Sequence, residues 1–130
     1  MQDHYKTHGA FSWNELMTTD PEAAKHFYSE LFGWEMQEYP MGDMNYTVAK
    51  IGDESVGGIM PMAPESAGTP PNWGAYITVD DVDATVEKVT ALNGKVLSPP
   101  QDIPDVGRMA TIQDPQGAVL MVMTFVEMAE

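Results

Sequence analysis

Few residues of this 130-residue chain suit the commonest enzyme chemistry. The chain has no Cys, which excludes disulfides, thiolate zinc sites, iron–sulfur clusters and Cys nucleophiles. None of its Ser residues stands in a Gly-x-Ser-x-Gly turn, so acyl transfer by a Ser nucleophile is not indicated. Gly57 and Gly58 lack the strand-to-helix context of a phosphate-binding loop, and they are better explained by a bend in a sheet.

Three His and a single Arg remain as candidate ligands or anchors. His4 and His8 lie near the N-terminus, and His26 falls on the solvent side of an expected helix, so an exposed position is favoured over a metal ligand for each. Arg108 could hold an anionic ligand through two parallel hydrogen bonds, or it could pair at the surface with an acidic residue. Both interpretations of Arg108 stay open.

The charge balance narrows the choice of partners. Six Lys and Arg against twenty Asp and Glu give a net charge of −14. Nucleic acid and anionic membranes are poor partners, because their binding depends on Lys and Arg. A cationic small molecule would be attracted, although an acidic surface also serves solubility or adaptation to salt. The N-terminus lacks a signal-peptide pattern and no apolar stretch is long enough to span a bilayer, so we expect a cytoplasmic protein.

A repeat at a constant offset of 61 residues divides the chain into two similar halves. Residues 16–23 and 31–33 align with residues 77–84 and 92–94. Each half begins with an expected strand, followed by Asp20 or Asp81 as a helix cap and, at the helix end, by Gly33 or Gly94. Apolar residues recur at helical spacing in both predicted helices, namely Ala23, Ala24, Phe27, Tyr28 and Leu31 in one and Val82, Val86, Val89 and Leu92 in the other.

Three short strands are predicted after each helix, so the pattern is βαβββ twice. The predicted strands span residues 10–18, 35–39, 46–51 and 56–62, then 74–79, 95–97, 108–113 and 118–126. Residues 98–105 are expected to be irregular. The predicted fold class is α+β, as one domain over residues 1–130 with module one at about 9–63, a linker at about 64–72 and module two at about 73–127.

Several short motifs support a family resemblance. Asp20-Pro21-Glu22-Ala23-Ala24, Leu31-Phe32-Gly33-Trp34 and Asp114-Pro115-Gln116-Gly117-Ala118 occur in order within the duplicated layout. Together they resemble the vicinal oxygen chelate superfamily, which includes glyoxalase I, methylmalonyl-CoA epimerase, extradiol dioxygenases and bleomycin-resistance proteins. The resemblance covers nearly the whole chain. It implies that each half curls a mixed sheet into a cup with a helix on the outer face. It also implies that paired cups enclose a small-molecule site, either within one chain or across a two-fold dimer. We expect this protein to be a homodimer.

The resemblance also implies where a metal would bind. Metal-using members carry one His, Gln or Glu near the start of each first strand and one Glu on each last strand. These positions correspond to Trp13 and Gly74, and to Met60 and Met121 at the same offset of 61. None is a hard ligand, whereas Mg, Mn, Fe, Ni and Zn need carboxylate or imidazole donors. We therefore expect no divalent metal and no other cofactor.

Because strand side chains alternate between faces, residues in phase with these positions would line the implied cup. The candidate ligand-binding set is Trp13, Glu15, Met17, Met60, Met62, Trp73, Tyr76, Thr78, Arg108, Met121 and Met123. Met adapts to flat or irregular apolar ligands, and Trp with Glu can hold a cation. The alternative is that the Met residues simply fill a core.

Three functions from different classes follow. The first is a metal-free binding protein, similar to the bleomycin-resistance branch, that holds a small aromatic or cationic compound. The second is a lyase or isomerase resembling lactoylglutathione lyase, either metal-independent with Glu15 as base and Tyr76 as proton donor, or metal-dependent through unrecognised ligands. The third is a structural or regulatory domain with a vestigial cup.

Overall fold

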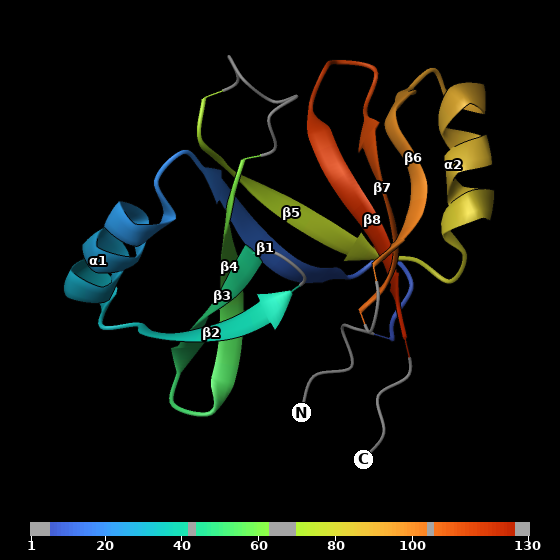
Figure 1. Cartoon of the computed structure of the whole chain (residues 1–130). Helices are drawn as coiled ribbons and strands as arrows, with labels where there is room; N and C mark the ends of the chain where they lie inside the picture. Colours follow the sequence, from blue (N-terminus) through green and yellow to red (C-terminus); the bar gives the residue numbers. More distant parts are fainter. Residues whose placement is uncertain (1–5, 42–43, 63–69, 104–105, 127–130) are drawn as a thin grey trace. The chain divides into compact units, whose positions relative to one another are not determined.

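The computed structural model describes residues 6–41, 44–62, 70–103 and 106–126 (Figure 1). The chain divides into two compact units, which we term the first unit (residues 13–74) and the second unit (residues 1–12 with 75–130). The order of elements confirms the predicted α+β fold with two βαβββ modules. The elements are β1 (Phe11–Thr18), α1 (Pro21–Phe32), β2 (Glu35–Met41), β3 (Met44–Ile51), β4 (Glu54–Pro61), β5 (Asn72–Thr78), α2 (Val82–Ala91), β6 (Lys95–Ile103), β7 (Gly107–Gln113) and β8 (Val119–Phe125).

The two units repeat one strand arrangement. The first has the order β2-β3-β4-β1, and the second has the order β6-β7-β8-β5. In each, the first strand pairs in parallel with the last, and the remaining pairs are antiparallel. Glu15 pairs with Gly58, and its equivalent Tyr76 pairs with Met121. The equivalent of Met121 in the first unit is therefore Gly58, which corrects the offset of 61 that pointed to Met60.

The offset changes because β6 is longer than predicted. It extends through most of a segment that was predicted to be irregular. Residues 98–103 belong to this strand, while 104–105 lie outside the described residues. The pairing of β6 with β7 shifts register between Val96 and Ser98 and again between Ser98 and Gln101. Pro99 and Pro100 fall within this irregularity, where the missing N–H groups cost least. β6 has nine residues and β2 has seven, so after these strands the equivalent positions of the two units are separated by more than 61 residues.

Helix α2 packs onto its sheet much as the sequence predicts. The Asp81 carboxylate caps its start by accepting the Ala84 N–H at 3.1 Å. Val82 and Val89 are buried, and Val86 packs on a core cluster of Val79, Val82, Ala110 and Val122. Leu92 is 70% exposed, because the helix ends there, and Asn93 rather than Gly94 takes the left-handed conformation, with φ of 70°. Figure 1 shows α2 running along β6.

Helix α1 departs from the prediction on one side. Asp20 caps its start through the Ala23 N–H, Pro21 occupies its first turn, and Gly33 ends it with φ of 77°. Of the apolar residues predicted to recur along this helix, Ala24 and Tyr28 are half-buried, whereas Ala23, Phe27 and Leu31 are exposed. No residue of α1 is fully buried. Neither helix in the described ranges is long and apolar enough to cross a membrane.

Candidate ligand-binding site

In the first unit, one face of the sheet gathers the predicted site residues of β1 and β4. Alternation places Trp13, Glu15 and Met17 on the same face of β1. The parallel register sets Glu15 beside Gly58 and Met17 beside Met60. Trp13, Met17 and Met60 are half-buried, whereas Glu15 is 6% exposed. This face, which we term the β1–β4 face, therefore presents aromatic and thioether surface around one buried carboxylate.

A tyrosine that the sequence analysis did not single out completes the β1–β4 face. The indole Nε1 of Trp13 donates a hydrogen bond of 2.9 Å to the Tyr46 hydroxyl oxygen. That hydroxyl lies directly over Gly58, since a Cβ built on Gly58 would be 1.9 Å from it. Gly58 thus makes room for Tyr46, and Tyr46 fixes the orientation of the Trp13 ring.

The residues here do not fit a divalent metal. The implied ligand positions in the first unit are Trp13 and, by the observed register, Gly58. Neither offers a carboxylate or imidazole, and the Tyr46 ring occupies the space beside both. Within the described part of the chain, no three His, Cys, Asp or Glu residues are grouped so that they could hold a metal ion.

Trp73 lies on the opposite face of the first unit. A Cβ on Gly57 would be 3.7 Å from the Trp73 ring, and Gly57 faces away from Gly58. Trp73 Nε1 donates to the Tyr28 hydroxyl at 3.2 Å, and its ring centroid is 6.2 Å from that of Trp34. The structure therefore brings Trp73 together with α1 rather than with Trp13. Met62 follows β4 and donates its backbone N–H to Thr18.

The predicted residues of the second unit are more deeply buried. Tyr76 pairs with Met121 and Thr78 pairs with Met123, so the four side chains share one face of β5 and β8. Their exposed fractions range from 3% to 8%. Little of their surface is open to a ligand, as is also true of Glu15, whereas Trp13, Met17 and Met60 of the first unit are partly exposed.

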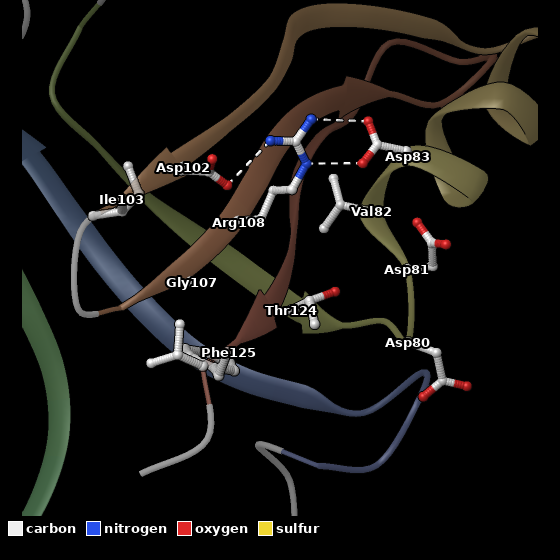
Figure 2. A pocket seen from close by; sticks show the side chains of 11 residues that line it. Asp80, Asp81, Val82, Asp83, Asp102, Ile103, Gly107, Arg108, Thr124 and Phe125 are labelled. Carbon is white, nitrogen blue, oxygen red and sulfur yellow. Dashed lines mark hydrogen bonds and ion pairs between the residues drawn. The ribbon is translucent and has the colours of Figure 1, made fainter.

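Arg108 lines an open groove of about 450 Å³ at the start of α2 in the second unit (Figure 2). Its partner across the sheet is Thr124 of β8, which donates a hydrogen bond to the Val79 carbonyl. The groove is lined by Asp80, Asp81, Val82, Asp83, Asp102, Ile103, Gly107, Arg108, Thr124, Phe125 and Val126. Of these, only Arg108 is predicted from the sequence as a site residue.

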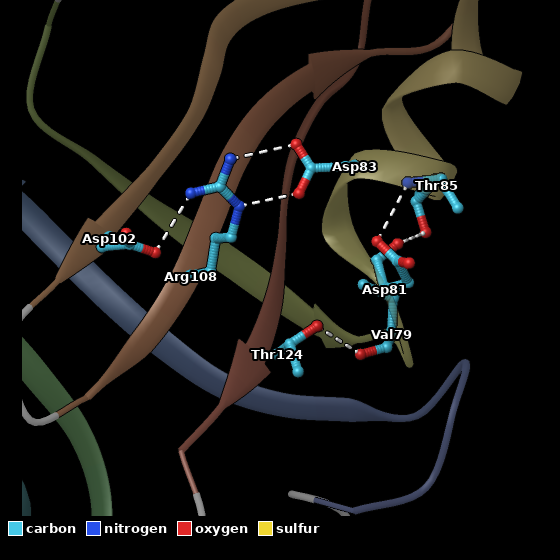
Figure 3. Close-up of polar contacts among 8 residues, drawn as sticks. Val79, Asp81, Asp83, Thr85, Asp102, Arg108 and Thr124 are labelled. Carbon is cyan, nitrogen blue, oxygen red and sulfur yellow. Dashed lines mark hydrogen bonds and ion pairs between the residues drawn. The ribbon is translucent and has the colours of Figure 1, made fainter.

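The guanidinium of Arg108 is held by acidic neighbours (Figure 3). Its Nε and one terminal nitrogen donate to the two Asp83 carboxylate oxygens at 2.8 and 3.0 Å, and its other terminal nitrogen donates to Asp102 at 3.1 Å. Hydrogen bonding to Arg108 lowers the pKa of Asp83, and the same bonds raise the pKa of Arg108. Of the two interpretations of Arg108, the structure shows the ion pair, and the four Asp of the groove disfavour an anionic ligand.

Comparisons with known proteins agree on a family. The sequence model of the Glyoxalase/Bleomycin resistance protein/Dioxygenase superfamily matches residues 3–122. "Putative glyoxylase CFP32" of Mycobacterium tuberculosis is 47% identical over 86% of this chain and 44% of its own length. "Anthracycline biosynthesis protein DnrV" of Streptomyces peucetius is 32% identical over 88% of this chain and 46% of its own length. The chain thus spans about half the length of these curated relatives.

Among solved structures, a methylmalonyl-CoA epimerase from Streptomyces coelicolor has a similar fold. The similarity covers 93% of this chain and 100% of the epimerase chain, with a TM-score of 0.66. The sequences are 16% identical. This similarity concerns the fold alone.

Proposed function

Since the chain belongs to the Glyoxalase/Bleomycin resistance protein/Dioxygenase superfamily, we propose that it binds a small, flat, cationic aromatic compound on the β1–β4 face without a metal ion. The observation that carries the proposal is the Trp13–Tyr46 hydrogen bond beside the buried carboxylate of Glu15. A fixed indole ring offers a flat surface that loses little freedom when a ligand stacks on it. A neighbouring carboxylate favours a ligand that carries positive charge.

The Met residues support the same ligand class. Met17 and Met60 lie side by side in the register and are half-buried. Their unbranched, polarizable side chains adapt to irregular apolar outlines, which suits a surface that accepts related compounds. The net charge of −14 adds long-range attraction for a cation. We also propose that the protein works in the cytoplasm as a homodimer.

A fluorescent anthracycline with a protonated amino sugar is a suitable probe, because one relative is named for anthracycline biosynthesis. Its uncharged aglycone is the matched probe that keeps the rings and lacks the charge. We expect Trp13→Ala to weaken both probes at least tenfold, and Glu15→Gln to weaken only the charged one. Arg108→Gln, in the other unit, is the control and should change neither. Equal affinity of wild type and Trp13→Ala for both probes would refute the proposal.

A lyase or isomerase activity is the second candidate. It is favoured by the name of the glyoxylase relative and by the burial of Glu15, a position suited to a general base. The test is turnover of the hemithioacetal of methylglyoxal and glutathione by chelator-treated protein. Activity that falls at least a hundredfold in Glu15→Gln would favour this candidate, and activity unchanged by Glu15→Gln would exclude Glu15 as its base.

A further inference from the structure

Helix α1 and the strand residue beside it expose several large apolar side chains. Phe27 and Leu31 are each 56% exposed, and Phe32 is 57% exposed. Trp73, from β5, is 41% exposed and lies beside this helix through Tyr28. We term the set Phe27, Tyr28, Leu31, Phe32, Trp34 and Trp73 the α1 aromatic face; all six lie in the first unit.

The rings of the α1 aromatic face hold one another in place. Tyr28 is central, with ring centroids 5.0 Å from Phe27, 6.1 Å from Phe32 and 5.5 Å from Trp73. The Tyr28 hydroxyl also accepts the Trp73 indole N–H. A face fixed in this way loses little side-chain freedom when a partner covers it, so most of the gain from burial is retained.

The size of the face matches the centre of a protein interface. Large side chains bury about 150–250 Å² each, so four that are about half exposed leave roughly 400 Å² of apolar surface. A stable interface covers about 800 Å² on each partner, with an apolar centre and a polar rim. The α1 aromatic face would supply that centre, and Glu30 and His26, exposed on the same helix, would lie at the rim.

A second copy of this chain is the occupant that best fits. The curated relatives CFP32 and DnrV are each about twice as long as this chain, so each has room for two stretches of this length. In a homodimer, a second copy of this chain would take the place of the second stretch that the longer relatives have room for within one molecule. The face contains no charged side chain, so it is where two chains of charge −14 can touch with least repulsion.

We propose that the α1 aromatic face is the contact between two copies of this chain, related by a two-fold axis that packs the face on itself. The inference rests on the homodimer proposed above and adds the surface that forms it. In a two-fold contact each substitution acts twice, because the same patch is used by both copies. Polar substitutions in the face should therefore weaken association strongly.

The test is sedimentation equilibrium of wild type and of Phe27→Gln/Leu31→Gln. Gln adds no charge, its helix propensity equals that of Leu and exceeds that of Phe, and neither replaced residue is buried. Leu92→Gln, at the end of α2, is the matched control, because Leu92 is 70% exposed and lies in the other unit. Circular dichroism and the urea midpoint establish that each variant folds. We expect a wild-type mass of twice 14.3 kDa, a dimer dissociation constant raised at least a hundredfold in the double variant, and no change in Leu92→Gln.

Salt provides an independent readout. Raising NaCl from about 0.05 M to about 0.5 M shortens the Debye length from roughly 14 Å to roughly 4 Å, which screens the repulsion between two acidic chains. An apolar contact between like-charged copies should tighten at least threefold, whereas a contact held by ion pairs would weaken. A dimer that the double variant leaves intact would overturn the assignment of the surface and leave the dimer standing. A monomeric wild type at high concentration would overturn both, while the probe titrations above test ligand binding separately.

Discussion

The indole N–H of Trp13 and the hydroxyl of Tyr46, 33 residues apart in sequence, form a hydrogen bond of 2.9 Å over a backbone position that has no side chain. The bond joins the first strand of the module to the third. Three features of the sequence must coincide for it to form: a ring at position 13, a phenol at position 46 and a glycine at position 58.

Tyr46→Phe removes the acceptor of this bond and keeps the ring. We expect a loss of about 1 kcal/mol in the free energy of unfolding, because the half-buried indole N–H loses its partner. The measurement is urea unfolding followed by circular dichroism. Tyr39→Phe, on β2 and 41% exposed, is the control and should change stability by less than about 0.5 kcal/mol.

Gly58→Ala should displace Tyr46. The new Cβ would lie 1.9 Å from the Tyr46 hydroxyl oxygen and 2.6 Å from Cζ, so the ring must swing away and release Trp13. We expect a cost of about 1–3 kcal/mol. In a Tyr46→Ala background the same change should cost much less, and a double-mutant cycle measures the difference. Additive effects would show that the Tyr46 ring is not what the Cβ meets.

Gly107→Ala tests the start of β7 in the second unit. A Cβ there would meet backbone atoms, 2.2 Å from the Thr124 carbonyl oxygen and 2.9 Å from the Phe125 Cα, and the backbone has φ of +156°. Backbone cannot rotate away as a side chain can, so we expect a loss of about 2–4 kcal/mol by urea unfolding. Gly52→Ala is the comparison: it has open space and φ of +59°, so only the conformational cost of about 1 kcal/mol applies. A smaller loss at Gly107 than at Gly52 would contradict this account.

The Asp83–Arg108 pair predicts how stability depends on pH. Hydrogen bonding from Arg108 lowers the pKa of Asp83 below its ordinary value of 3.8. A carboxylate with a lowered folded-state pKa stabilises the protein above that ordinary value, and its contribution is lost as the pH falls through the folded-state pKa. Asp83→Asn should therefore lower the thermal midpoint slightly at pH 7, by an amount limited by solvent exposure, and the difference should shrink as the pH falls below 3.8 and vanish once Asp83 is protonated in the folded protein. A difference that persists at low pH would mean that Asp83 acts through packing rather than charge.

Local sequence signals predicted most of the fold because they act over a few residues. Asp20 and Asp81 cap helices, and Gly33 ends one. The repeat at an offset of 61 residues aligns the sequence of β1 with that of β5. Period-two alternation also placed Trp13, Glu15 and Met17 on one face. These signals need no knowledge of which strands pair.

The features that depend on which strands pair, and in which register, could not be predicted from the sequence. Tyr46 was missed because its role depends on β3 lying beside β4, with Val48 opposite Gly58, and nothing in the sequence fixes that pairing. A glycine in the middle of a predicted strand was the available signal, since it often marks a close approach. The outward side of α1 was predicted wrongly because its apolar spacing is the same whether Phe27 and Leu31 meet a sheet or stay exposed.

The additional length of β6 lies where it disturbs the rest of its sheet least. The two βαβββ modules share the same parallel pairing of first and last strands, while the longer β6 accommodates its extra residues as two register shifts around Pro99 and Pro100. β6 stands at one end of the strand order in its unit, so length gained there leaves the inner strands undisturbed. A difference in length confined to the outermost strand is therefore compatible with the same pairing of β1 with β4 and of β5 with β8.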